Sequence, residues 1–250
     1  MKGYRGNTRN SVLRSASVKL AAFVAALGTA CLLLPSAIGS VQGDVPDRVF
    51  TYSVHHPIHG EIGSYTNHIK DTGDEVSVRN EIRIVVKILF AVAHAQNGDN
   101  TEVWRNGRLV SYQGVTKENG EEIKITGRAD GKQFVIETPE GRVEAPAHVS
   151  PNNPWSMGIL KASVLMGTKS GSLYRVQVTG GEKRTVKVGA REVETRYYKV
   201  DGDAQYELWF DDRGIPVKFT DRRENGLITF KLVEDAAAEP KVIKGSLGGN

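Results

Sequence analysis

Residues 207–219 read ELWFDDRGIPVKF. An apolar stretch leads into a polar turn, and a second stretch returns with apolar residues at every other position. A β-hairpin has this pattern, because strand residues alternate between two faces and Asp and Gly favour turns. Residues 101–112, TEVWRNGRLVSY, repeat the design with Asn-Gly in place of the acidic residues. We therefore interpret Asp211-Asp212 as part of a turn and not as a catalytic or metal-binding pair.

Turns of this kind recur along most of the chain. From Gly107 to Gly141 the glycine-containing turns follow one another at steps of 13, 11 and 10 residues. Asn-Gly and Asp-Gly supply the backbone angles that tight hairpins need, and short strands at regular spacing indicate an antiparallel meander. We predict a mainly β fold, a curved open sheet or half-barrel, as a single domain over 48–233. A flexible tail is predicted over 235–250.

One apolar run departs from this regular alternation. Residues 82–95 read IRIVVKILFAVAHA and are apolar at nearly every position. The β-branched start favours a long strand, bent, and buried on both faces or lining a cavity, with a helix as the alternative. The run therefore supplies the apolar wall of a predicted cavity.

A helix is predicted over about 154–166. An apolar stripe is formed at helical spacing by Trp155, Ile159, Leu160, Val164 and Leu165. Asn153 is placed to cap this helix, Pro154 suits its first position, and Gly167 suits its end. An amphipathic helix between two series of strands is expected to pack on the concave face of the sheet.

The amino-terminal segment has the layout of a secretory signal peptide. Residues 1–39 carry five of the 33 basic residues and no acidic residue, and residues 20–39 are uncharged. We predict a signal peptide over 1–39 that is cleaved before Ser40, or an uncleaved anchor, since about 20 apolar residues span a bilayer. The protein is therefore expected to be periplasmic or secreted.

Charge and cysteine content limit the partners. The formal net charge is +4, but 33 basic residues less the five in the leader leave 28 against 29 acidic residues. A nearly neutral domain lacks the basic surface that nucleic-acid binding needs, so no nucleic-acid partner is expected. The only cysteine, Cys31, lies in the leader, so the remaining chain has no thiol for disulfides, zinc sites or nucleophilic catalysis.

His55 and His59, with His56 beside the first, are the candidates for a metal site. Imidazole is a common metal ligand, and a hairpin can bring several rings to one ion. His55 and His56 point to opposite faces of a strand, so at most one of them joins His59. No carboxylate stands at the spacing of a known metal motif. Polar turn residues are the simpler interpretation, and we predict no cofactor.

No motif indicates an enzyme. The chain has no G-x-S-x-G, and residues 167–171 have neither the spacing of a nucleophile elbow nor that of a phosphate-binding loop. Adjacent carboxylates such as Glu121 and Glu122 face apart on a strand and do not form an acid/base pair. The sequence favours a non-enzymatic protein without catalytic residues.

Both hairpins carry a family resemblance. The pattern E-x-W-x-[DN]-G-[KR]-L is matched by Glu102, Trp104, Asn106, Gly107, Arg108 and Leu109. The pattern L-W-[FY]-D-x-x-G is matched by Leu208, Trp209, Phe210, Asp211 and Gly214. Over residues 48–233 the chain resembles the exported β-rich family known as domain of unknown function 6134. More distantly it resembles LolA/LolB-like periplasmic half-barrels, which shelter acyl chains in an apolar cavity beside an internal helix.

These observations lead to one expected function and two alternatives. We expect non-enzymatic binding or carriage of an apolar or lipid-like ligand in the cell envelope, because a helix over a concave sheet encloses a cavity. The predicted cavity-lining residues are Ile84, Val86, Ile88, Phe90, Trp104, Trp155, Ile159, Leu160 and Trp209. An envelope interaction or scaffold protein, whose sheet edge pairs with a partner, is the first alternative. A His-dependent metal enzyme is the second. Membrane contact is expected only through the leader, if it stays uncleaved.

Overall fold

The computed structural model describes residues 48–223 and 226–237, with side chains as far as Val233. The predicted signal peptide, its cleavage site and Cys31 lie outside the described residues. Most of the predicted tail, residues 238–250, also lies outside them. Among the described residues, no helix is both long enough and apolar enough to cross a membrane.

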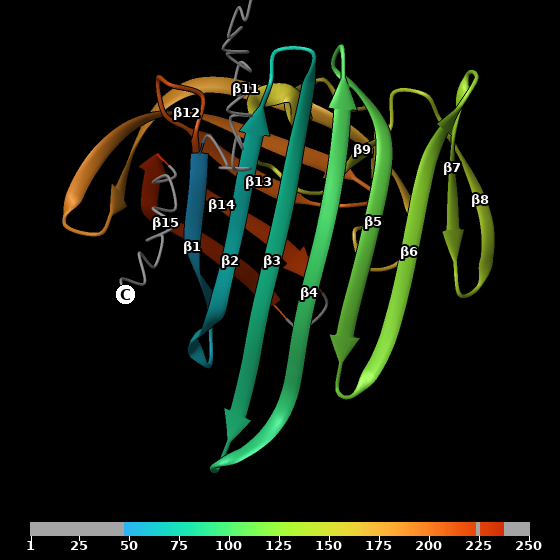
Figure 1. Ribbon diagram of the computed structural model, residues 1–250. Coiled ribbons are helices and arrows are strands. Elements are labelled where there is room, and N and C mark those ends of the chain that lie inside the picture. The colour runs from blue at the N-terminus through green and yellow to red at the C-terminus, as the bar shows by residue number, and fades with distance from the viewer. Residues whose placement is uncertain (1–47, 224–225, 238–250) are drawn as a thin grey trace, which may run out of the picture. The chain divides into compact units, whose positions relative to one another are not determined.

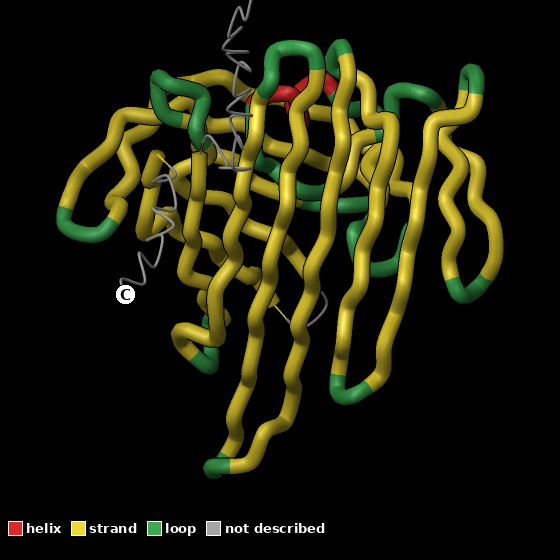
Figure 2. The backbone as a smooth tube through the Cα atoms, in the orientation of Figure 1, coloured by secondary structure: helices red, strands yellow, loops and turns green. Residues whose placement is uncertain are grey.

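The described chain is built almost entirely of strands, which form one 15-stranded sheet. The strands are β1 (Arg48–His56), β2 (Gly60–Asp71), β3 (Glu75–Ile88), β4 (Ala91–Arg105), β5 (Arg108–Glu118), β6 (Glu121–Asp130), β7 (Gln133–Thr138), β8 (Gly141–Pro146), β9 (Ser150–Pro151), β10 (Val164–Met166), β11 (Leu173–Val188), β12 (Arg191–Gly202), β13 (Tyr206–Phe210), β14 (Pro216–Arg223) and β15 (Gly226–Ala237). The described chain has a single helical turn, the 3-10 element η1 (Met157–Lys161), drawn red in Figure 2.

The strand order is a meander that folds over itself. The order across the sheet is β8-β7-β6-β5-β4-β3-β2-β1-β15-β14-β13-β12-β11-β10-β9, so the first strand pairs with the last. All neighbours are antiparallel except β9 and β10. In Figure 1 the strands β1 to β6 stand side by side in front, and β11 to β15 cross behind them. The predicted fold class, a mainly β antiparallel meander forming a curved open sheet, is therefore confirmed.

Local turn chemistry explains the hairpins. Asn106 and Asn119 adopt positive φ values of 51° and 52°, and the following glycines also adopt positive φ. Asn and Gly accept this left-handed conformation most readily. The acidic pair is a turn, as predicted. Asp211 Oδ1 accepts hydrogen bonds from the backbone N–H groups of Arg213 and Ile215, at 3.1 and 2.8 Å.

The apolar run 82–95 is a hairpin, which contradicts the prediction of one long strand. β3 ends at Ile88, Leu89 and Phe90 make the turn, and β4 starts at Ala91. Both turn residues have positive φ, 48° and 70°, which branched and bulky side chains rarely adopt. The sequence carries no Asn, Asp or Gly at this position, so its turn chemistry gave no signal.

The predicted helix over 154–166 is also wrong, because only the five residues of η1 are helical. Val164–Met166 instead forms β10, which pairs antiparallel with Leu173–Arg175 in β11. Strand pairing therefore overrides the helical spacing. The apolar residues that suggested one stripe are divided between two cores: Leu165 packs into the first, and Val164 packs against the second.

The first core lies between the two series of strands. Tyr65 of β2 packs edge-on against Phe219 of β14 and Phe230 of β15, with ring centroids 5.6 and 5.3 Å apart. The second, smaller core contains Tyr112, Phe134 and Met166 among others. Segment 149–172 thus packs against the inner face of the sheet and helps to enclose the space between its two halves.

Candidate functional site

A row of amide side chains crosses the inner face of the sheet. Asn67 of β2 lies opposite Asn80 of β3, and Asn80 lies opposite Asn100 of β4. Their exposed fractions are 1%, 3% and 4%. Asn80 Nδ2 donates to Asn67 Oδ1 at 3.1 Å and to the carbonyl of Thr66 at 3.2 Å. Buried amides are costly unless they are hydrogen-bonded, so this row is an unusual lining for a sheet interior.

Two glycines keep the same face open. A Cβ at Gly98 would lie 2.6 Å from Ile82 Cγ2, and one at Gly114 would lie 2.7 Å from Asn100 Oδ1. Real Cβ atoms do not approach that closely, so any larger residue would displace these neighbours. Glycine here makes room for the amides and for the space above them.

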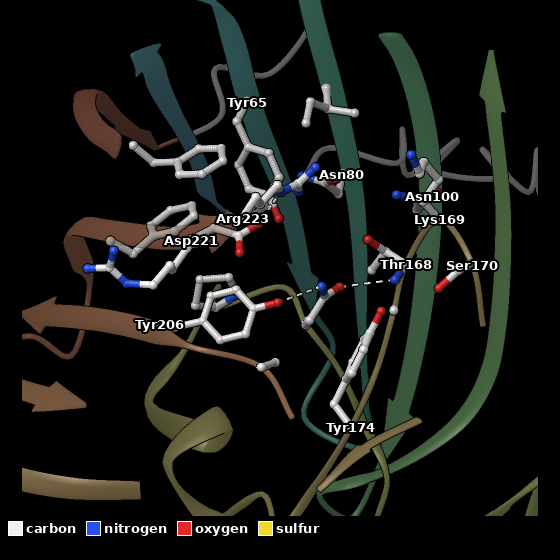
Figure 3. Close-up of a pocket in the computed structure, with 18 of the residues that line it drawn as sticks. Tyr65, Asn80, Asn100, Thr168, Lys169, Ser170, Tyr174, Tyr206, Asp221 and Arg223 are labelled. Carbon is white, nitrogen blue, oxygen red and sulfur yellow. Dashed lines mark hydrogen bonds and ion pairs between the residues drawn. The ribbon is translucent and has the colours of Figure 1, made fainter. Parts of the chain in front are cut away.

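The segment between β9 and β11 closes this space from the side. Asn152 Nδ2 donates to the hydroxyl of Tyr206 at 2.9 Å, and the backbone N–H of Thr168 donates to Asn152 Oδ1 at 3.0 Å. Dashed lines in Figure 3 mark this chain of contacts from Tyr206 to Thr168. Lys169 Nζ adds an ion pair to both carboxylate oxygens of Glu118, at 3.0 and 2.8 Å. The segment is therefore fastened to both halves of the sheet.

A cavity of about 470 Å³ lies between the amide row and this segment. Its polar lining residues are Tyr65, Asn80, Gln96, Asn100, Thr116, Asn152, Thr168, Lys169, Ser170, Tyr174, Asp203, Gln205, Tyr206, Asp221, Arg222 and Arg223. Its apolar lining includes Ile82, Phe219 and Phe230. Figure 3 shows the tyrosines, amides and charged groups approaching the space from several strands. The size suits a small molecule, and the lining suits one that forms many hydrogen bonds.

Two of the carboxylates in the cavity wall, Asp221 and Asp203, have hydrogen-bond partners within the protein. Arg223 Nε donates to Asp221 Oδ2 at 2.7 Å, and Asp203 Oδ2 accepts from the backbone N–H of Arg175 at 2.9 Å. Burial, followed by the nearby charge of Asp221, raises the pKa of Tyr206, so this phenol stays protonated and able to donate. The cavity thus offers neutral hydrogen-bonding groups more than uncompensated charge.

One amide atom in the cavity is unsatisfied. Asn100 Oδ1 is buried and has no hydrogen-bond partner among the described residues. A buried acceptor without a donor destabilises a protein by about 1–3 kcal/mol. The oxygen itself is enclosed by protein, so a ligand in the cavity would meet Asn100 at the accessible part of its side chain.

Glu102 anchors the enclosing segment from below. Its carboxylate is 1% exposed and accepts hydrogen bonds from Asn153 Nδ2, Trp104 Nε1 and Trp155 Nε1, at 2.9, 2.9 and 3.1 Å. Tyr65 in turn donates to Asn153 Oδ1 at 2.6 Å. Burial raises the pKa of Glu102 to about 7, and its three hydrogen bonds oppose that rise. The carboxylate does not line the cavity, so its role is to position residues 152–155.

None of the nine predicted lining residues borders this cavity. Ile84 is buried in the first core and Val86 packs at its margin. Ile88 and Phe90 are exposed at the end of the β3–β4 hairpin. A different space, of about 380 Å³, is bordered by Trp104, Trp155 and Ile159. Leu160 packs against the first core, and Trp209 is buried between the ring of Tyr197 and the ammonium of Lys218.

The histidines are not gathered into a metal centre. His55 Nε2 lies 2.9 Å from the hydroxyl of Ser53, whereas the ring of His56 lies against that of His59, at 4.7 Å between centroids. Across the described residues, no three His, Cys, Asp or Glu side chains are grouped as ligands for an ion. The structure therefore does not bring His55 and His59 together as a ligand set.

Sequence analysis missed the amide row, although β4 carried a signal. Along QNGDNTE, residues 96–102, polar residues and glycine occupy both faces of a strand. A strand that is polar on both faces either stands in water or lines a polar interior, and the position of β4 inside the sheet selects the second. Because an apolar cavity was predicted, this polar stretch was not assigned to its wall.

Comparisons with known proteins agree with the fold. The crystal structure of a beta-barrel-like protein of domain of unknown function DUF1849, from Brucella abortus, matches with a TM-score of 0.56 and 12% sequence identity. The match covers 78% of this chain and 99% of that one. At this identity it shows the fold alone. No curated protein matches the sequence.

The family itself is shown by sequence. The model described as domain of unknown function DUF6134 matches residues 59–233, most of the chain. This range contains both hairpins that carried the resemblance, the amide row and the enclosing segment. The chain therefore belongs to the DUF6134 family.

Proposed function

We propose that this protein is a non-enzymatic binding protein of the cell envelope, and that its cavity holds a small, uncharged ligand rich in hydroxyl groups, such as a saccharide. The observation that carries the proposal is the set of amide side chains, Asn80, Gln96 and Asn100, that line one wall of the cavity. The basic and apolar leader supports export to the envelope.

The chemistry of the lining supports a hydroxyl-rich ligand. A carboxamide offers a donor and an acceptor side by side, which matches a pair of neighbouring hydroxyl groups. Asn80, Gln96 and Asn100 supply three such groups on one wall. Tyr65, Tyr174 and Tyr206 add phenol hydroxyls and ring faces on the others. This combination favours a sugar-like molecule over an acyl chain, so the proposed ligand differs from the apolar one that the sequence suggested.

Binding is favoured over catalysis by the state of the cavity's ionisable groups. Asp221 is paired with Arg223, and Lys169 is paired with Glu118. No histidine borders the cavity along the described residues. A general base must reach a substrate proton, and the two ion pairs hold Asp221 and Lys169 to other partners, while Asp203 accepts a hydrogen bond from the backbone N–H of Arg175.

The proposal is tested by ligand binding to the Asn100→Ala variant. Wild-type protein is screened on a glycan array, and the saccharides retained are titrated by calorimetry. Asn97→Ala is the matched control, because Asn97 is exposed on the same strand. We expect binding to weaken at least about tenfold in Asn100→Ala, corresponding to the loss of one buried hydrogen bond, and to stay unchanged in Asn97→Ala.

Fatty-acyl probes form the opposing arm of the same experiment. If a fluorescent fatty acid binds stoichiometrically while no glycan is retained, the polar-ligand proposal is wrong. Equal loss of glycan binding in Asn97→Ala and Asn100→Ala would place the ligand outside the cavity and would also reject it.

A further inference from the structure

The end of the β3–β4 hairpin is an apolar finger, residues 85–94. The ladder between β2 and β3 ends at Ile84, and the ladder between β4 and β5 begins at Gln96. Between those points the two strands pair only with each other, from Val85 opposite Ala95 to the turn. Figure 1 shows this hairpin reaching past the neighbouring hairpins at the same end of the sheet. The finger therefore stands free of the sheet that supports it.

Exposed apolar side chains are concentrated on the finger. The described residues have nine exposed large apolar side chains, and five of them are Val85, Ile88, Leu89, Phe90 and Val92. Leu89 is 91% exposed, and Phe90 is fully exposed. Ile58, at the end of the adjacent β1–β2 hairpin, is 80% exposed. Such a concentration marks an interaction site, whereas single exposed apolar residues are ordinary.

The turn at the fingertip retains bulky apolar residues against local preference. Leu89 and Phe90 both hold left-handed backbone angles, which the turns at residues 106–107 and 119–120 assign to Asn and Gly. Asn-Gly would fit this turn with less strain. Folding alone therefore does not account for Leu and Phe here.

The charge pattern of the finger identifies the partner. Residues 82–98 contain no acidic residue and two cations, Lys87 and Arg83, the second of which is ion-paired with Glu81. The acidic end of the next hairpin, which includes Glu121, does not reach the fingertip, because Asn119 is hydrogen-bonded at the level of Ala95. An apolar tip with cations at its stem matches a membrane surface that carries anionic lipids.

The shape of the finger also fits a bilayer better than a protein groove. Its apolar residues occupy both faces and the tip, whereas a groove on a partner protein would contact only one face of a hairpin. Its outer strand edges are unpaired, and hydrocarbon cannot satisfy those backbone groups. Contact is therefore limited to the headgroup and upper acyl region, about 5–10 Å deep.

We propose that the β3–β4 finger docks this protein on anionic lipid bilayers by shallow insertion of Leu89 and Phe90. This contact is separate from any anchoring by the leader and does not depend on what the cavity binds. Insertion at this end places the cavity wall at Ile82 and Gln96, the root of the finger, next to the membrane surface.

The first test measures depth in the full chain. Cys31→Ser removes the only native thiol, and Leu89→Cys is then labelled with an environment-sensitive nitrobenzoxadiazole dye. Asn106→Cys, in an exposed turn at the other end of β4, carries the dye in the control. With vesicles of phosphatidylcholine and phosphatidylglycerol, we expect a blue shift and quenching by brominated acyl chains at position 89 only. Dye that stays in water at position 89, or equal quenching at both positions, overturns the proposal even if the leader tethers the chain.

The second test replaces the fingertip with the turn that the protein uses elsewhere. Leu89→Asn combined with Phe90→Gly eases the turn, so loss of binding cannot be attributed to misfolding. We expect at least a tenfold weaker partitioning onto the same vesicles, with no change for Val233→Thr, which alters an apolar residue elsewhere that is 63% exposed. Unchanged partitioning of the double variant rejects the proposal. A lipid-free dimer that the double variant dissolves would instead assign the finger to a second copy of the chain.

Discussion

Strands β13 to β15 carry Leu208, Phe219 and Phe230 on their inner face, whereas β2 to β4 carry Asn67, Asn80 and Asn100 on theirs. Both faces are buried, although burial alternates along β2 to β4 and not along β13 and β14, where consecutive residues are buried. In one half the rings pack on one another: Phe219 and Phe230 are stacked with centroids 4.2 Å apart. In the other half the side chains form hydrogen bonds. Burial of a face therefore does not show whether the interior that it meets is dry.

The contrast separates stability from function. The aromatic half buries large apolar surfaces, which is the main stabilising term in folding. The amide side chains themselves gain little from burial and need hydrogen-bond partners for their polar atoms. A cavity lies against the amides, and one amide acceptor remains unsatisfied there. We infer that the aromatic half carries the fold and that the amide half is available for binding.

The largest expected effect is in the aromatic half. Phe219→Ala removes a ring that contacts Tyr52, Tyr65 and Phe230, and we expect a loss of about 3–5 kcal/mol in the free energy of unfolding. Urea denaturation followed by tryptophan fluorescence measures this value. A loss below about 1 kcal/mol would show that the ring cluster is not the main core.

The next effect concerns Glu102, which supports the amide half. Its pKa is raised in the native state to about 7 from a usual value of 4.5. The native state therefore holds a proton that the unfolded chain releases, and this stabilisation is complete below pH 4.5 and lost as the pH rises through 7. By linkage, the free energy of unfolding is expected to fall by about 3 kcal/mol as the pH rises through this range.

Comparing wild type with Glu102→Gln isolates this contribution, because the amide does not titrate. Unfolding free energies are measured by urea denaturation at several pH values from 4 to 8. We expect the difference in unfolding free energy between wild type and variant to shrink by about 3 kcal/mol from pH 4 to pH 8. Parallel curves for the two proteins would mean that Glu102 has an ordinary pKa.

The smallest effect is expected at the unsatisfied amide. Asn100→Leu replaces a buried acceptor that lacks a donor with an apolar side chain of similar size. The free energy of unfolding should change by less than about 1 kcal/mol, because no hydrogen bond is lost. Thermal denaturation of Asn100→Leu and of Asn80→Leu, each compared with wild type, measures the two changes in stability. The second variant loses two hydrogen bonds and should be clearly less stable. Equal losses would contradict a binding role for Asn100.

The sequence predicted the parts of the fold that depend on local chemistry. Asn106-Gly107 and Asp211 identified hairpins because their side chains and backbone angles act within a few residues. The turn at Leu89-Phe90 was missed because the pairing of two apolar strands imposes it without a turn residue. The helix over 154–166 was wrong because Leu165 and Met166 serve different cores, an arrangement that spacing along the chain does not encode.

The candidate site was hidden for a similar reason. Asn67, Asn80 and Asn100 are 13 and 20 residues apart along the chain, and only the register of three strands places them in one row. Each asparagine alone resembles a surface residue. The apolar run that forms the finger is evident in the sequence, but its exposure depends on where the neighbouring strands end.

Pairing of the first strand with the last also governs how the domain assembles. Val54 lies opposite Phe230, so the sheet cannot be completed before nearly the whole domain has emerged from the ribosome. Such distant contacts fold slowly. Until β15 arrives, β1 presents an open edge to other chains, which is a known route to aggregation. A chain truncated before residue 226 should therefore accumulate as aggregates rather than as a smaller folded unit.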